Sequence, residues 1–590
     1  TTNLAASDVV EDTPTDNYCV LNPLDKRSTI TFAEGNLSVA TSTSGNYGGF
    51  RATMGLPLTG KWYWECKTPT VGYITALGIA DGSGAINSTG NAPSKYTVLS
   101  LGSWHSTYNS GVPQYCLNVS PTAGSNWTQS TNSSAGSVFM MAVDMDNGSM
   151  WWGLDGTWFA NQAGTTANPA TNAGPQRTGL NDGTTWFPYA TEASGSASTS
   201  SSQLLFDFGQ SGFAQTPPTG FLALSTANLP TPTIAKPSEH FSTKLWTATS
   251  TNPKVLDFPW SFATDGGLVW QKMRNSSGYN YLFDTVRGDD KALYSNTSNA
   301  EQGYGPSYYT QDFDASGDYS IQQDGVGNEV NYSGNTYVAW GWKKSATAGM
   351  DIVTWTGDGA MSGQAVSHGL GVAPEMVIAK DRLGSAGVGG DWVVHHKDLS
   401  HSTLNKYLVL NATTAETAYG MTNAIGSISS SSVTFDNDMV FMGSSQLLNT
   451  GTMGGMQPAD TYVAYLFASV EGFSKCGFWV GTGSASTAPF VYTGFRPAWI
   501  MHKEIDTSSY DWVIHDTTRD TYNDSTWNHL IANQSDDENG TNTGPASGFA
   551  DVLSNGFKLN SVSVEHGNGS GKKYIYVAFA EAPLKYASAR

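Results

Sequence analysis

Four short patterns recur three times, in the same order, between residue 239 and the C-terminus. Each copy has an apolar run ending in Lys, a second apolar run with a polar end, a polar turn ending in Glu, and an aromatic strand that begins with Tyr. The closing tyrosines are 125 and 114 residues apart, which is too long for a solenoid repeat of roughly 20 to 50 residues. The sequence therefore predicts three tandem domains of similar fold. The marker residues, in chain order within each set, are Lys272, Lys380 and Lys503; Glu301, Glu416 and Glu538; and Tyr337, Tyr462 and Tyr576.

The three copies are rich in Trp, Tyr, Val and Thr and poor in helical periodicity, which predicts β-sandwich-like modules or half-barrels with one or two short helical turns at most. We place module 1 at 239–347, module 2 at 348–473 and module 3 at 474–590. Module 2 is longer because of a Gly-, Ser- and Met-rich stretch, 419–459, and insertions of this kind belong in exposed loops.

The first part of the chain has short apolar or alternating runs broken by Gly and Asn, the pattern of an antiparallel β-sandwich over 18–229. The run 139–144, a turn at Asp146-Asn147-Gly148 and the run 149–152 form the clearest hairpin, because Asn-Gly readily takes the positive φ of a two-residue turn. Residues 1–17 are a polar lead-in, and 230–238 form a Pro-rich linker. The predicted fold class is all-β: one sandwich followed by three similar modules.

Motifs of the first part resemble the SPRY (B30.2-like) domain. They are Lys61-Trp62-Tyr63-Trp64-Glu65, the run 143–148 with Trp151-Trp152, Asp155-Gly156-Thr157-Trp158, and Phe206-Asp207-Phe208-Gly209. The resemblance implies a bent two-sheet sandwich that binds partners through loops at one end, with a long Ser- and Gly-rich excursion at 193–202.

Composition limits the partners. With 29 basic and 49 acidic residues the formal net charge is −20, which disfavours nucleic acid and anionic membranes. Cys19, Cys66, Cys116 and Cys476 lack the spacing of a zinc or redox motif and are interpreted as mostly buried thiols. The start of the sequence lacks the pattern of a signal peptide, and no apolar run approaches the roughly 20 residues of a membrane span.

Candidate catalytic and metal-binding patterns are weak. The stretch 567–573 resembles a phosphate loop but lacks its first Gly and its hydroxyl residue, so a hairpin turn is favoured. His395 and His396 would face opposite ways on a strand, which argues against one shared ion with His401. The carboxylates of 144–148 suit a turn better than a calcium loop.

Recurring carboxylates suggest a role in the fold. Asp284 and Asp516 occupy one position in two copies, and a Glu ends the polar turn in all three. Three copies of an active site would be unusual, so we interpret these residues as structural, although a glycosidase-like pair from distant strands stays open. The sequence predicts no enzyme, no cofactor and no metal site.

Aromatic side chains are the remaining functional signal. Rings in loops beside Asn, Asp and Ser suit sugars and adaptable protein contacts, and the alternative for each ring is a place in the core or in an interface. The candidate ligand-binding residues are Trp104, Tyr108, Trp127, Trp158 and Trp186.

The SPRY-like motifs, the segment 213–221 and the tandem modules with the joint Glu471-Gly472-Phe473-Ser474-Lys475 together resemble virion proteins of marine tailed bacteriophages. The resemblance implies an exposed virion protein, made in the host cytoplasm without a signal peptide. Its expected role is that of a tail fibre or spike adhesin that binds a host-surface glycan or outer-membrane protein. The alternative is a head fibre, decoration or lattice protein that serves assembly, and the lack of an evident shaft favours it. Expected partners are other virion proteins and further copies of the chain, and the resemblance implies that the oligomer is a trimer.

Overall fold

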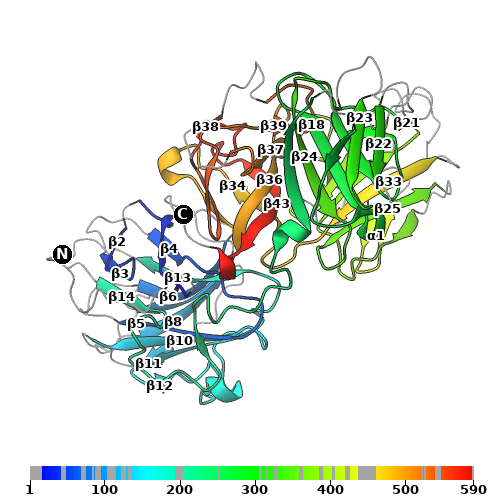
Figure 1. Ribbon diagram of the computed structural model, residues 1–590. Coiled ribbons are helices and arrows are strands. Elements are labelled where there is room, and N and C mark those ends of the chain that lie inside the picture. The colour runs from blue at the N-terminus through cyan, green and yellow to red at the C-terminus, as the bar shows by residue number, and fades with distance from the viewer. Residues whose placement is uncertain are drawn as a thin grey trace. The chain divides into compact units, whose positions relative to one another are not determined.

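The computed structural model confirms the all-β fold class (Figure 1). In the described part, helix is limited to α1 (Phe262–Asp265) and the 3-10 turns η2 (Pro169–Thr171), η3 (Pro237–Glu239), η5 (Ala485–Thr487) and η6 (Leu584–Tyr586). The chain forms two compact units, one of residues 1–231, 489–494 and 584–590, and one of 232–488 and 495–583. The structure describes residues 13, 16–28, 30–40, 48–67, 75–82, 86, 95–101, 114–120, 128–130, 136–192, 203–249, 253–303, 309–313, 316–323, 330–357, 363–383, 390–400, 406–418, 425–435, 460–520, 523, 526–538 and 546–587.

The first unit is a two-sheet sandwich. One sheet has the order β1-β4-β13-β6-β7-β8-β9, and the other β12-β11-β10-β5-β14-β3-β2, with β15 parallel to β5. The indole of Trp152 links the two sheets, because its Nε1 donates to the Leu77 carbonyl at 3.0 Å. The strands are β1 (Leu21–Lys26), β2 (Thr31–Ala33), β3 (Ser38–Ala40), β4 (Gly48–Ala52), β5 (Lys61–Lys67), β6 (Thr75–Asp81), β7 (Tyr96–Leu101), β8 (Gln114–Ser120), β9 (Thr128–Ser130), β10 (Val138–Asp144), β11 (Ser149–Leu154), β12 (Thr157–Trp158), β13 (Trp186–Glu192), β14 (Gln203–Asp207) and β15 (Leu222–Ala223).

Strand β5 is buried on both faces, which explains its unbroken aromatic bulk. Trp62 and Trp64 belong to the core between the sheets, whereas Tyr63 belongs to a second cluster on the outer face with Trp151 and Phe221. The buried Glu65 carboxylate accepts from the Tyr63 hydroxyl at 2.7 Å and from the backbone amides of residues 214 and 215, each at 2.8 Å. The segment 213–221 therefore covers this face of the sheet.

The predicted hairpin is present as β10–β11, but its loop has four residues rather than two. Asp144 pairs with Ser149, so 145–148 form the loop, and of these only Gly148 has a positive φ, at 64°. The Asp144 carboxylate accepts from the Asn147 amide at 3.0 Å and pairs with Lys61 at 3.0 Å. Because this turn uses its carboxylate internally, it is a structural turn.

The second unit contains one topology written three times. In each module the first and last strands pair, the Lys-bearing strand follows, and further strands extend the sheet: β16-β24-β18-β19-β20-β21, β25-β33-β27-β28-β29-β30, and β34-β43-β36-β37-β39. A small sheet accompanies the first two, β17-β23-β22 and β26-β32-β31, and the hairpin β41–β42 occupies this place in the third.

The strands of module 1 are β16 (Phe241–Thr247), β17 (Lys254–Leu256), β18 (Gly267–Met273), β19 (Asn280–Asp284), β20 (Lys291–Tyr294), β21 (Gln302–Gly303), β22 (Tyr309–Phe313), β23 (Tyr319–Gln323) and β24 (Thr336–Lys343). Those of module 2 are β25 (Met350–Thr356), β26 (Gln364–Ser367), β27 (Met376–Asp381), β28 (Val393–His396), β29 (Lys406–Val409), β30 (Thr417–Ala418), β31 (Ile425–Ile428), β32 (Ser432–Phe435) and β33 (Thr461–Phe467). Those of the third copy are β34 (Ser474–Val480), β35 (Phe490–Tyr492), β36 (Phe495–Glu504), β37 (Val513–Asp516), β38 (Thr526–Trp527), β39 (Leu530–Ile531), β40 (Ala546–Ser547), β41 (Ala550–Leu553), β42 (Gly556–Leu559) and β43 (Lys573–Pro583).

The structural register corrects one of the repeat markers. A Trp of the first strand stacks on a Tyr of the last strand in every module: Trp246 on Tyr337 at 5.0 Å, Trp355 on Tyr462 at 5.2 Å, and Trp479 on Tyr574 at 5.3 Å. The counterpart in module 3 is therefore Tyr574, and the choice of Tyr576 from sequence was wrong by two residues. Two residues along a strand return to the same face, so hydrophobic alternation alone does not separate the two tyrosines.

The three modules close into a ring, in which each contacts both others. The last strands bring together the equivalent rings of Trp342, Phe467 and Phe579, with centroids 6.3 Å (342 to 467), 5.7 Å (342 to 579) and 5.9 Å (467 to 579) apart. These rings surround a pseudo-three-fold axis. We call the three packed modules the module ring.

Candidate functional site

The aromatic ligand candidates divide into three groups. Trp104, Tyr108 and Trp127 lie outside the described residues. Trp186 is 2% exposed in the sandwich core, and its Nε1 donates to the Leu180 carbonyl at 2.9 Å, so it has the core role that was the alternative. Trp158 is half-buried on β12 and lies edge-on to Tyr63 at 6.4 Å. Among the described candidates, only Trp158 keeps an accessible surface.

The marker lysines form hydrogen bonds from one module to the next. Lys272, Lys380 and Lys503 are at most 2% exposed. Lys380 donates to the Gly390 carbonyl in its own module and to the Ser298 carbonyl of module 1 at 2.9 Å. Lys503 likewise bonds its own module at Tyr510 (2.7 Å) and module 2 at Thr413 (3.4 Å), and Lys272 bonds Gly278 (3.0 Å) and Gln534 of module 3 (3.4 Å). Burial lowers the pKa of Lys380 and of Lys503 to about 8.

The marker glutamates make the reciprocal contact. Their backbone amides donate to the residue two places after the neighbouring lysine: Glu301 to Arg382 at 2.7 Å, Glu416 to Ile505 at 2.9 Å, and Glu538 to Arg274 at 2.7 Å. These three contacts run in one direction around the ring. They support the structural interpretation of the recurring glutamates.

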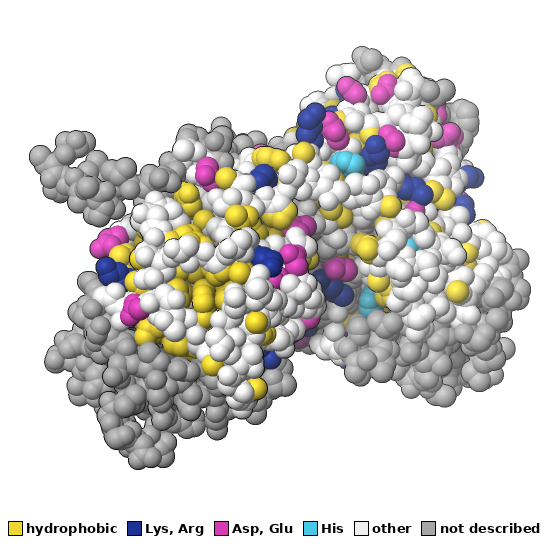
Figure 2. Space-filling model, turned by 90° about the horizontal axis from the view of Figure 1, so that it is seen from below, with side chains coloured by type: hydrophobic (Ala, Val, Ile, Leu, Met, Phe, Trp, Pro, Cys, Tyr) yellow, Lys and Arg dark blue, Asp and Glu magenta, His cyan; other side chains and the backbone are white. Residues whose placement is uncertain are grey.

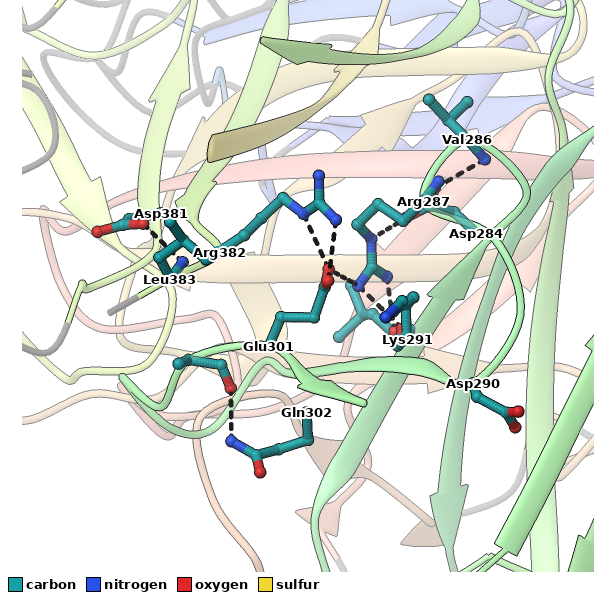
Figure 3. A network of polar contacts seen from close by, with 12 residues as sticks. Asp284, Val286, Arg287, Asp290, Lys291, Glu301, Gln302, Asp381, Arg382 and Leu383 are labelled. Carbon is teal, nitrogen blue, oxygen red and sulfur yellow. Dashed lines mark hydrogen bonds and ion pairs between the residues drawn. The ribbon is translucent and has the colours of Figure 1, made fainter. Parts of the chain in front are cut away.

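Buried ion pairs reinforce two of the three interfaces. At the module 1–2 interface, Glu301 lies between Arg382 and Arg287, and Figure 3 shows both guanidinium groups directed at its carboxylate. Arg287 also pairs with Asp284, and both side chains are 0% exposed. Burial alone would lower the pKa of Arg287, but the charges of Asp284 and Glu301 outweigh burial and raise it. At the module 3–1 interface, Glu538, Arg274, Arg519 and Asp516 repeat this arrangement.

A cross-module hydrogen bond completes each ion-pair cluster. The Tyr465 hydroxyl of module 2 donates to Asp284 at 2.9 Å. At the equivalent place, Trp340 of module 1 donates through Nε1 to Asp516 at 3.0 Å. Oδ2 of each recurring aspartate therefore takes the cross-module bond. Oδ1 accepts from backbone amides of its own module, Arg287 at 2.9 Å from Asp284 and Arg519 at 2.9 Å from Asp516.

At the module 2–3 interface, different residues stand at the positions of this ion-pair cluster. The register places Val577, which has no side-chain donor, where the other modules have Trp340 and Tyr465. The facing aspartate becomes His396, whose Nε2 lies 3.1 Å from the Tyr576 carbonyl, and the arginine three residues later becomes Leu399. Glu416 meets Ile505 instead of an arginine, and its carboxylate accepts from the Ser400 amide at 2.8 Å. Burial lowers the pKa of His396 to about 3, which keeps this substitute neutral.

A third repeated contact comes from the residue that opens each second apolar run. Trp392 donates through Nε1 to the Tyr294 carbonyl of module 1 at 2.7 Å, and Trp512 to the Val409 carbonyl of module 2 at 2.9 Å. Asn280 holds this position in module 1 and reaches the Ile531 carbonyl of module 3 at 3.2 Å. Sequence reasoning aligned these runs but could not show that they cross to the next module.

Metal and phosphate binding find no support in the described ranges. No group of three or more His, Cys, Asp or Glu side chains there is placed to hold a metal ion. His395 and His396 are adjacent on β28, and His401 lies outside the described residues. The stretch 567–573 is an ordered connection into β43, in which the Gly567 carbonyl accepts from Trp479 Nε1 at 2.6 Å. Strand β43 pairs with β34 and β36, so the predicted hairpin turn here was wrong.

Comparison with protein families gives a match for the part of the chain that forms the module ring. Residues 236–583, more than half of the sequence, match a family described as a domain of unknown function, DUF7483. The chain belongs to the DUF7483 family. The matched region of this DUF7483 protein begins at the linker and ends at the last residues of β43.

Solved structures similar to this DUF7483 protein include two SPRY domains. The SPRY domain of human HERC1 is 12% identical, with 32% of this chain and 96% of that chain covered and a TM-score of 0.19. The PSpry domain of TRIM65 is 9% identical, with 32% and 92% covered and a TM-score of 0.21. No curated protein matches the sequence. Among the described residues, no helix is long and apolar enough to cross a bilayer.

Proposed function

We propose that this DUF7483 protein is a non-enzymatic, exposed component of a tailed-bacteriophage particle and acts as a tail-fibre or spike adhesin. The observation that carries the proposal is the use of the recurring polar residues. The recurring lysines, glutamates and aspartates of the module ring make contacts between modules, as Glu301 illustrates through its ion pair with Arg382 of module 2. A ring held in this way is a rigid frame, and recognition then falls to loops.

The surface also supports this proposal. Charged residues are 13% of the chain, and on the face drawn in Figure 2 they are scattered among hydrophobic side chains, shown in yellow, and polar uncharged side chains and backbone, shown in white. Such a surface favours hydrogen bonds and aromatic stacking over charge pairing, which suits glycans. Several copies on one particle would convert weak contacts into firm attachment through effective concentration.

The experiment labels the purified full chain with a fluorophore and measures binding to candidate host cells, together with inhibition of adsorption of the parent phage. We expect saturable binding that blocks adsorption. The half-exposed Trp158→Ala variant is compared with Trp186→Phe, which changes a core residue without a contribution to the surface. Folded protein that binds no permissive host and does not slow adsorption would refute the adhesin role.

A structural role in the head is the second candidate. It is favoured by the short helices of the described residues: the longest, α1, has four residues, so the described part includes no coiled-coil shaft that would hold an adhesin away from the particle. Immunogold labelling of intact particles separates the two, because an adhesin carries gold at the tail and a decoration protein carries it over the head.

A further inference from the structure

Four histidines are packed together in the core of module 3. His502 lies on β36 and His515 on β37, while His529 follows β38 and His566 precedes β43. They are 1%, 0%, 2% and 7% exposed, respectively. The ring of Phe549 stacks on His515 at 3.9 Å and on His502 at 4.9 Å. His515 and His529 have centroids 6.2 Å apart, and His529 and His566 have centroids 5.2 Å apart. We call these four residues the histidine cluster.

The two central imidazoles lack hydrogen-bond partners. Within the part of the chain that the structure describes, neither ring nitrogen of His502 or His515 has one. Module 1 avoids this cost at the same positions. Module 1 has Gln271, whose amide donates to the Val330 carbonyl at 2.7 Å and accepts from Tyr319 at 3.0 Å, and it has Phe283 in place of His515. A buried polar group without a partner destabilises a fold by about 1–3 kcal/mol, so these two positions call for an explanation.

The surroundings of the histidine cluster disfavour a positive charge. The positive charge of Lys503 lowers the pKa of His502, and that of Arg519 lowers the pKa of His515. The histidines also lower the pKa values of one another. Glu538 opposes them only at His529. Burial is the largest cause and lowers the pKa of His502 to about 3, of His529 to about 4, and of His515 well below its ordinary value. These imidazoles are therefore held neutral in the fold and become free to protonate when the module opens.

The two strands that carry the cluster also carry the contacts of module 3 with its neighbours. Lys503, next to His502, clasps module 2, and Asp516, next to His515, accepts from Trp340 of module 1. Loosening β36 and β37 would therefore release both interfaces of this module at once.

We propose that the histidine cluster is an acid-sensitive latch, through which protonation below about pH 6 opens module 3 and releases the module ring. Module 1 lacks these histidines at the equivalent positions and stays closed over the same range. The inference does not depend on the adhesin role, because it concerns the stability of the ring.

Two carboxyl groups of module 3 act in the opposite direction. Burial raises the pKa of Glu565 to about 7 and that of Asp520 to about 6. The folded state takes up protons at these groups before the unfolded state does, so they stabilise module 3 as the pH falls. The test therefore compares variants at each pH and does not rely on the wild type alone.

The test measures opening of β36–β37 by hydrogen exchange with mass spectrometry at pH 7.5 and 5.0, corrected for the intrinsic pH dependence of exchange. A histidine held neutral in the fold, with an ordinary pKa of 6.5 when unfolded, raises the opening constant about 30-fold at pH 5.0. The double variant His502→Gln and His515→Phe copies module 1. We expect its opening constant to rise about 1,000-fold less than that of the wild type between the two pH values.

His368→Gln is the matched control. This histidine lies in module 2, where its ring contacts the Ser429 carbonyl at 3.2 Å, and we expect it to leave the response of module 3 unchanged. An equal pH response in the double variant and the wild type would overturn the proposal. If the double variant does not fold, the single variant His502→Gln takes its place. We expect its opening constant to rise about 30-fold less than that of the wild type between the two pH values, and an equal rise overturns the latch.

Discussion

Asp284 and Arg287 form one energetic unit, and removing either partner alone should cost far more than removing both. Both side chains are 0% exposed, so Asp284→Asn leaves the Arg287 charge buried with Glu301 as its remaining carboxylate. Arg287→Leu leaves a buried carboxylate that still accepts from Tyr465. Breaking a buried pair in this way costs about 3–5 kcal/mol, whereas replacing the whole pair by neutral groups is often close to neutral.

We therefore expect each single change to lower the free energy of opening of β18–β19 by about 3–5 kcal/mol, and the double variant to be no worse than either single variant. Module 2 already has two neutral residues at these positions, His396 and Leu399, as the double variant would. The coupling energy should be at least about 3 kcal/mol.

Hydrogen exchange of peptides spanning residues 267–284 provides the assay, since it reports the opening of module 1 within the intact chain. Asp182→Asn serves as the control, because the Lys95–Asp182 pair is 41% and 40% exposed and should contribute less than about 1 kcal/mol. Additive losses in the two single variants, with a double variant worse by their sum, would refute the idea that these residues act as a unit.

Three further predictions test other contacts. Burial lowers the pKa of Lys380 to about 8, so as the pH rises the folded chain loses this proton before the unfolded chain does, and stability should rise between about pH 8 and 10.5. The variant Lys380→Met should lack this part of the rise, measured as denaturation midpoints at each pH. Trp392→Phe removes the 2.7 Å hydrogen bond to module 1 and should cost about 1–2 kcal/mol in local exchange, with full protection retained in the first unit as the check. Gly78→Ala places a Cβ 2.1 Å from a backbone carbonyl of β7 and should cost about 3 kcal/mol by calorimetry, whereas Gly303→Ala meets only a Lys291 atom at 3.5 Å and should be nearly neutral.

Repetition in the sequence carried much information about the fold. Glu301, Glu416 and Glu538 recur at one place, and the structure gives each the same backbone contact to the next module. Recurrence could not say that the contact crosses between modules, because a single sequence records positions along the chain and not neighbours in space. The buried lysines were visible only as ends of apolar runs, and their partner carbonyls have no signature in sequence.

Other features failed to be predicted for local reasons. Tyr576 was preferred over Tyr574 because the two share a face of β43, and the stacking partner Trp479 on β34 decides between them. Trp186 was a candidate as a loop ring beside polar residues, but it begins strand β13 and lies in the core. The histidine cluster comes from four separate segments, and no spacing in the sequence marks it.

A ring encoded in one polypeptide differs from a trimer of identical subunits in what a single mutation does. In a trimer every substitution is made three times, so a weak or unusual contact weakens all three interfaces together. Here Ile505, His396 and Asn280 each occur once, and each alters one interface while its counterparts keep arginine, aspartate or tryptophan. A substitution in this chain can therefore change one interface and leave the other two as they are, which a ring of identical subunits does not allow.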